Sequence, residues 1–131
     1  MDRWTGAFTP AVAFALLVLV VSLVPVPDSG GQAVPALLGV ALDKWVHAGS
    51  YALLTGLAVR ARRQRDLLAV AAVAAVVVGY GAGIEVLQSL VPTRDLSPLD
   101  ALANTAGVVA AGLVLVAAES SSIRVRWLSE Q

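Results

Sequence analysis

Nine residues whose side chains could do chemistry lie in or beside long apolar stretches of this 131-residue chain. They are Asp43, Lys44, His47, Tyr51, Glu85, Gln88, Arg94, Asp100 and Asn104. Carboxylates and an imidazole can exchange protons, and lysine and arginine can bind anionic groups. Ionisable groups at membrane depth are costly and generally face a protein interior or a water-filled cavity. The sequence therefore predicts that function is concentrated in this set.

The spacing of these residues predicts three helices that each carry one polar stripe. The stripes consist of Asp43, His47 and Tyr51, of Gly81, Glu85 and Gln88, and of Asp100, Asn104 and Gly107. Residues three or four positions apart share one face of a helix. Polar stripes on otherwise apolar helices avoid lipid by facing one another. We therefore expect the three stripes to converge.

Two residues are candidates for catalysis. His47 is the only histidine, and an imidazole normally titrates near neutral pH, so it could accept or donate a proton. Glu85 is the deepest carboxylate and is the second candidate. One imidazole and no thiol argue against zinc, so we predict no metal site and no cofactor. Lys44 and Arg94 could together hold an anion, because the planar arginine fork suits phosphate and carboxylate.

Structural roles are the alternative for the carboxylates. The run Ser97-Pro98-Leu99-Asp100 has the form of a helix start. Ser97 would be the N-cap, Pro98 the first helical residue, and Asp100 the acid that reaches back as in a capping box. Glu85 could pair with a neighbouring basic side chain only to hold helices together, as buried polar groups in membrane bundles often do.

The composition indicates an integral membrane protein. The chain is 58% hydrophobic with a mean hydropathy of +0.81 and only 14% charged residues, whereas soluble domains contain about 25% charged residues. The net charge of zero argues against nucleic acid as a partner. The absence of cysteine excludes disulfides and thiol chemistry.

The uncharged stretches predict an all-α fold, a bundle of four transmembrane helices that forms one domain over residues 1–131. A spanning helix needs about 20 mostly apolar residues. The predicted spans are residues 8–24, 42–59, 67–90 and 99–118. The second fits only if Asp43 and Lys44 sit at or just inside the interface. The apolar residues 35–42 are interpreted as an interfacial lead-in, and the glycines are interpreted as points of close helix approach.

The distribution of basic residues predicts the orientation of the bundle. The N-terminal tail, the segment 60–65 and the C-terminal tail hold seven of the nine lysines and arginines. Lys44 and Arg94 are the other two. Because basic residues in short loops favour the cytoplasm, we expect both termini to be cytoplasmic. The polar set would then lie at the outer face of a multi-pass protein of the cell membrane.

The ordered polar residues resemble the signatures of the VanZ-like family of small membrane proteins. The first signature is Asp43-Lys44-Trp45-Val46-His47-Ala48-Gly49-Ser50-Tyr51. The second runs from Glu85-Val86-Leu87-Gln88 through Arg94 to Asp100, Asn104 and Gly107. The resemblance covers about residues 43–112 and implies that all nine polar residues occupy the family's characteristic positions. The family takes its name from a protein associated with resistance to teicoplanin, and it implies no catalytic mechanism.

Three hypotheses for function follow. The leading one is an outer-facing polar pocket that binds a cell-envelope or lipid-linked anionic ligand, with a link to glycopeptide resistance. The second is a membrane hydrolase or transferase that acts on an envelope lipid, although no serine has a nucleophile motif. The third is a structural protein that assists a membrane partner. The expected partners are membrane lipids and a lipid-linked envelope precursor; the sequence leaves open whether the chain forms a homo-oligomer.

Overall fold

The described part of the chain folds into four helices and one short hairpin. A computed structural model describes residues 3–25, 35–62, 65–92, 94 and 96–129, with the side chains of residues 6–122 within these ranges. The helices are α1 (Arg3–Leu23), α2 (Leu42–Arg62), α3 (Leu67–Gln88) and α4 (Pro98–Ser129). The strands β1 (Ala36–Leu37) and β2 (Val40–Ala41) pair antiparallel. The prediction of an all-helical chain with four helices is confirmed, and the hairpin was not predicted.

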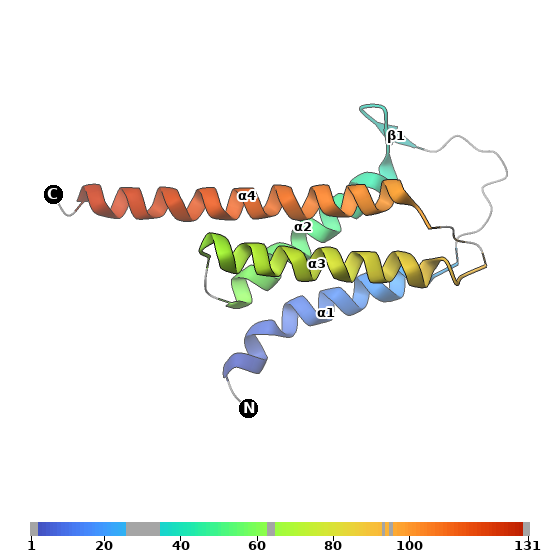
Figure 1. Cartoon of the computed structure of the whole chain (residues 1–131), viewed down its shortest axis with the longest axis horizontal. Coiled ribbons are helices and arrows are strands. Elements are labelled where there is room, and N and C mark those ends of the chain that lie inside the picture. The colour runs from blue at the N-terminus through green and yellow to red at the C-terminus, as the bar shows by residue number, and fades with distance from the viewer. Residues whose placement is uncertain (1–2, 26–34, 63–64, 93, 95, 130–131) are drawn as a thin grey trace.

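The helices alternate in direction along the bundle (Figure 1). The start of α1, the end of α4 and the connection from α2 to α3 lie at one end. The end of α1, the start of α2, the end of α3 and the start of α4 lie at the other, which we call the site end. The helix bounds differ most from the predicted spans in α4, which continues to Ser129 and projects past the other helices.

Local chemistry fixes the starts of α3 and α4. The Asp66 side chain caps α3 by accepting a hydrogen bond from the Ala69 N–H at 3.0 Å. The Ser97 hydroxyl caps α4 by accepting from the Asp100 N–H at 3.2 Å. Pro98 is the first residue of α4, where its missing N–H is not needed. The predicted N-cap at Ser97 is therefore confirmed.

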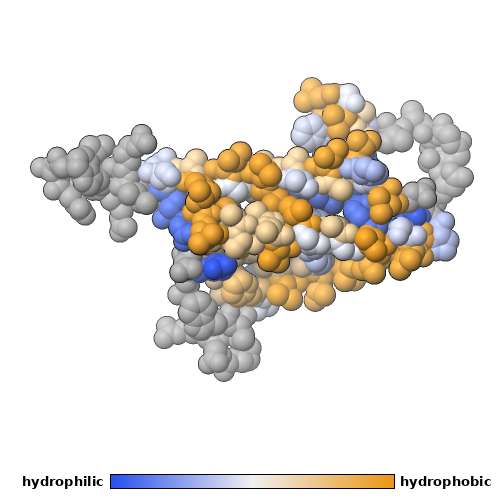
Figure 2. Space-filling view, viewed as in Figure 1, coloured by the Kyte–Doolittle hydropathy of each residue, from blue (hydrophilic) through white to orange (hydrophobic). Residues whose placement is uncertain are grey.

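Three helices are long and apolar enough to cross a membrane. The candidate spans are Gly6–Leu23, Leu67–Gln88 and Pro98–Ser122. Apolar residues cover most of the visible face, and hydrophilic residues gather towards its two ends (Figure 2). The chain therefore has the features of a multi-pass membrane protein. The predicted second span, α2, does not meet the same criterion, because its polar residues lower its hydropathy.

The core forms around α2, which packs against the other three helices. Its fully buried residues include Tyr51, Thr55 and Val59. The closest helix contact is between α2 and α4. A Cβ added at Gly107 would lie 2.0 Å from the carbonyl oxygen of Ala48, so the two backbones approach as only glycine permits.

The glycines divide into two groups. Gly81 and Gly107 meet close neighbours, and a Cβ at Gly112 would lie in ordinary contact with Val70. The other helical glycines that the structure describes have nothing within 4 Å of an added Cβ. They are Gly6, Gly49, Gly56, Gly79 and Gly83. The prediction that glycines mark close helix approach is therefore right at three positions and wrong at Gly49, Gly56, Gly79 and Gly83.

Candidate functional site

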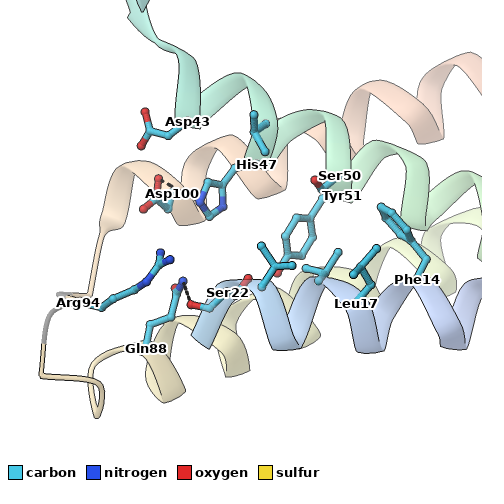
Figure 3. A pocket seen from close by; sticks show the side chains of 13 residues that line it. Phe14, Leu17, Ser22, Asp43, His47, Ser50, Tyr51, Gln88, Arg94 and Asp100 are labelled. Carbon is cyan, nitrogen blue, oxygen red and sulfur yellow. Dashed lines mark hydrogen bonds and ion pairs between the residues drawn. The ribbon is translucent and has the colours of Figure 1, made fainter. Parts of the chain in front are cut away.

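A cavity of about 570 Å³ lies at the site end of the bundle. One part of its lining is apolar and comes mainly from α1. The other part is polar and comes from α2, α3, α4 and the α3–α4 connection (Figure 3). The lining residues are Phe14, Leu17, Val18, Val21, Ser22, Asp43, Val46, His47, Ser50, Tyr51, Gln88, Arg94 and Asp100. The lining of the cavity is therefore amphiphilic: it consists of an apolar wall and a charged end.

Lys44 joins the first turn of α2 to the first turn of α4. Its Nζ donates to the Oδ2 of Asp43 at 2.6 Å and forms an ion pair with Asp100. The Lys44 side chain is 20% exposed and the Asp100 side chain 16% exposed, so this pair is largely removed from water. The two carboxylates share one ammonium, and the group carries excess negative charge when both acids are ionised. Lys44 does not line the cavity.

Glu85 supplies the hydrogen bond that the sequence assigned to Asp100. In a capping box, the acid three residues after the N-cap accepts the N-cap backbone N–H. Here Glu85 of α3 accepts the Ser97 N–H through Oε2 at 3.3 Å. Asp100 is thereby free to pair with Lys44. The Glu85 side chain is buried and lies outside the cavity lining.

His47 connects α2 to α4 beside the cavity. Its Nδ1 donates to the Oδ1 of Asn104 at 3.0 Å, and its Nε2 lies 3.8 Å from the Oδ1 of Asp100. Both ring nitrogens therefore face oxygen atoms of α4, although the second distance is longer than a hydrogen bond. Within the described residues, no group of three acidic or histidine side chains is placed to hold a metal ion.

Side chains of α3 and of the α3–α4 connection hold the end of α1. Gln88 Nε2 donates to the carbonyl oxygen of Ser22 at 3.0 Å. Arg94 donates through Nε and Nη2 to the carbonyl oxygen of Val24 at 3.1 and 3.0 Å. The last carbonyls of a helix lack intrahelical partners and carry the negative end of its dipole, so they attract donors and cations. These bonds keep the apolar wall of the cavity next to its polar end (Figure 3).

Tyr51 forms the part of the cavity next to α3. Its ring packs on Gly81, where an added Cβ would lie 2.8 Å from a ring carbon. The buried hydroxyl of Tyr51 and the Oε1 of Glu85 have no hydrogen-bond partner among the described residues. Buried polar atoms are nearly always paired with protein or water. These two atoms are therefore exceptions to the usual pairing of buried polar groups.

The structure brings the three predicted stripes together. Lys44 meets Asp100, His47 meets Asn104, and Tyr51 meets Gly81. Of the nine predicted site residues, six line the cavity: Asp43, His47, Tyr51, Gln88, Arg94 and Asp100. Of the other three, Lys44 pairs with Asp43 and Asp100 and Asn104 bonds to His47, so both contact lining residues. Glu85 bonds to Ser97, which does not line the cavity.

The sequence analysis missed the apolar wall of the cavity. Phe14, Leu17, Val18 and Val21 of α1 and Val46 of α2 form it, and two serines of the lining, Ser22 and Ser50, were missed as well. The spacing of Phe14, Val18 and Val21 at i, i+4 and i+7 places them on one helix face. Lipid-facing and cavity-facing residues of α1 are equally apolar, however, so this spacing could not be distinguished from the rest of the helix. Ser22 is the only polar residue of α1 after Thr9 and was the one available signal.

Comparison with known proteins adds no family or function. No protein-family model matches the chain, and no curated protein or solved structure is significantly similar to it.

Proposed function

We propose that this protein lies in the cell membrane and binds an amphiphilic lipid of the cell envelope in the cavity at its site end. The single observation that carries the proposal is the cavity's division into an apolar wall and a charged end. Binding sites for small ligands are typically mainly apolar, with a few polar groups that fix orientation. The acyl or isoprenoid chain of the lipid would lie along Phe14, Leu17 and Val21, and its head group would lie at the charged end.

The charged end favours a head group that is both anionic and rich in donors. Among the described residues, Arg94 is the only lysine or arginine that lines the cavity. Its Nε and Nη2 are bonded to the Val24 carbonyl, and its Nη1 faces no described acceptor within hydrogen-bond distance. A phosphate would bind there. The carboxylates of Asp43 and Asp100 would accept hydrogen bonds from hydroxyl or amine groups. A phosphate that carries a sugar, a glycerol or an amine combines these features, as lipid-linked envelope precursors do.

The proposal includes α2 as a fourth membrane span. Its 21 residues at about 1.5 Å each are close to the thickness of the hydrocarbon core of about 30 Å. Its residues Lys44, His47 and Tyr51 contact other helices. Leu53, which does not line the cavity, is apolar and 51% exposed. We place both termini in the cytoplasm, because the end with the chain termini carries seven of the nine basic residues. The cavity then faces the outer leaflet.

The resemblance to the VanZ-like family supports the same proposal from the sequence. Six of the nine polar residues that carry the resemblance line the cavity. A family member with a lipid-binding pocket could influence how a glycopeptide such as teicoplanin meets its lipid-linked target. We propose this link as a consequence of ligand binding rather than as a separate activity.

The arrangement of His47 favours binding over catalysis. Ser50 lies one helical turn from His47 and also lines the cavity. A serine nucleophile needs the imidazole within hydrogen-bond reach as its base. Among the described residues no hydrogen bond joins the Ser50 hydroxyl to His47, whose Nδ1 bonds to Asn104 and whose Nε2 lies 3.8 Å from Asp100. A membrane hydrolase or transferase is therefore the less supported alternative.

A bulky residue in the apolar wall should block the ligand. In the Leu17→Trp variant the indole would fill the cavity, so we expect a short-chain phosphatidylglycerol to raise the melting temperature of the wild type but not that of the variant. Ligands that bind only the folded state raise stability by about 2.7 kcal/mol at a hundred times their dissociation constant. The measurement is thermal unfolding in detergent with increasing lipid.

The matched control is Leu16→Trp. Leu16 is 56% exposed and Leu17 55% exposed, and both belong to α1, but only Leu17 lines the cavity. The control should respond to the lipid as the wild type does. Equal responses of all three proteins would contradict binding in the cavity.

A structural role is the second candidate, and one observation favours it. Lys44, Gln88 and Arg94 all have partners within the chain. A bundle locked by such bonds could serve as a scaffold for a membrane partner. In that case, substitutions at the site would lower thermal stability without any loss of lipid binding.

A further inference from the structure

The short hairpin beside α2 has the features of a membrane-surface anchor. It projects sideways from the site end of the bundle, next to the start of α4 (Figure 1). The segment Pro35–Leu42 has the sequence PALLGVAL and contains no charged residue. Leu38 at its tip is 85% exposed, and the cross-strand neighbours Leu37 and Val40 are also exposed. An apolar projection of this kind is unfavourable in water, so something must cover it.

The backbone at the tip does not itself favour leucine. Leu38 has φ 53° and Gly39 has φ 76°. Two successive residues with positive φ form the tight hairpin turn that favours Asn-Gly or Asp-Gly. A leucine in the left-handed region costs conformational energy that asparagine would largely avoid. The hairpin therefore retains a leucine where its own turn geometry favours a polar residue.

Hydrogen bonds close the hairpin and join it to α2. The Leu42 N–H donates to the carbonyl oxygen of Pro35 at 2.8 Å and closes its base. The indole Nε1 of Trp45 donates to the carbonyl oxygen of Leu37 at 3.2 Å. Trp45 stands in the first turn of α2 and thus fixes the hairpin to the helix. The position of the apolar tip is set by these two bonds.

We propose that the hairpin inserts into the interfacial region of the bilayer leaflet at the site end. The exposed residues Leu42 and Trp45 of α2 continue its apolar surface onto the lipid-facing side of the bundle. Tryptophan is enriched where membrane meets water. Asp43 is a charged side chain that is 50% exposed, and because an exposed charge is costly in hydrocarbon, this level of α2 fits the interface rather than the membrane core. The hairpin thus lies at head-group depth with its tip among the upper acyl chains.

The chain offers a direct test because it contains no cysteine. A Leu38→Cys variant would carry a nitroxide label in vesicles of phosphatidylcholine and phosphatidylglycerol. A label that collides mainly with oxygen lies in lipid, and a label that collides mainly with a water-soluble nickel chelate lies in water. We expect the label at position 38 to favour oxygen and to lie shallower than a label at Val76→Cys, which is 72% exposed in the middle of α3. A label at Arg65→Cys should favour the chelate.

The outcomes separate this inference from the membrane placement on which it rests. A label at position 76 that collides mainly with the chelate would overturn the membrane placement itself. A lipid-exposed label at 76 with a water-exposed label at 38 would overturn only the anchor. Protection of position 38 from both reagents would also overturn it, because a second copy or another protein would then cover the tip.

A second variant excludes disruption of the hairpin as an explanation. Leu38→Asn creates the Asn-Gly pair that this turn favours, so the hairpin should persist while its apolar tip is lost. A label at Leu37→Cys should then shift towards the chelate relative to the same label with Leu38 present. An unchanged depth would contradict insertion of the tip.

Discussion

Replacing Gly107 by alanine is expected to destabilise the folded bundle strongly. The new methyl group would lie 2.0 Å from the carbonyl oxygen of Ala48, and a backbone atom cannot turn aside as a flexible side chain can. The helices α2 and α4 would have to separate, which would also disturb the Lys44–Asp100 and His47–Asn104 contacts. Overpacking typically costs about 1–3 kcal/mol and occasionally more. We expect a cost at or above the upper end, measured as a lower melting temperature in detergent.

Gly83→Ala is the matched control for this prediction. Gly83 lies in α3 and has nothing within 4 Å of an added Cβ. Alanine is favoured over glycine in a helix by about 1 kcal/mol in water, so this variant should be as stable as the wild type or more so. Equal stability of Gly107→Ala and the wild type would show that α2 and α4 do not approach as closely as described.

Loss of Lys44 is expected to have the second large effect. Lys44→Met keeps the length of the side chain but leaves Asp43 and Asp100 without their shared cation. Removing one member of a buried ion pair costs about 3–5 kcal/mol, because the other charge stays uncompensated. The pair here is 16–20% exposed, so we expect the lower part of that range or less. The measurement is the free energy of unfolding in detergent.

A double-mutant cycle identifies the cause of that effect. Asp100→Asn should destabilise the protein alone, and the combination of Lys44→Met with Asp100→Asn should be more stable than the sum of the two single effects predicts. Glu119→Gln is a control that removes a carboxylate far along α4 from Lys44. Additive effects of the two site substitutions would contradict an energetic coupling between Lys44 and Asp100.

The helix contacts at the site were predictable because polar residues are rare in these helices, and their spacing shows which face of each helix avoids lipid. Asp43, His47 and Tyr51 are four residues apart and therefore lie on one face of α2. The polar stripes of α3 and α4 have spacings of four and three residues, so each also lies on one helix face, and the three faces meet. The contacts of Tyr51 with Gly81 and of His47 with Asn104 follow from this spacing.

Contacts with backbone atoms were not predictable. Glu85 was predicted as a candidate for catalysis, with pairing to a basic side chain as the alternative, and in the structure it accepts the backbone N–H of Ser97. Arg94 was expected to hold a ligand and is bonded to the Val24 carbonyl, although it also lines the cavity. Every residue has a backbone N–H or carbonyl, so its sequence position gives no sign of which one a side chain will reach. The apolar wall on α1 escaped notice for a similar reason, since lipid and an apolar cavity select the same residues.

Mass spectrometry of the lipids that copurify with the protein tests the central claim most directly. Wild type, Arg94→Ala and Arg65→Ala would be purified side by side and their lipids compared per mole of protein. Arg94 lines the cavity, whereas Arg65 is exposed in the connection between α2 and α3 at the opposite end. We predict one class of phosphate-containing envelope lipid that is enriched with the wild type and Arg65→Ala and depleted at least several-fold with Arg94→Ala. The same lipids in the same amounts with all three proteins would contradict a lipid-binding cavity.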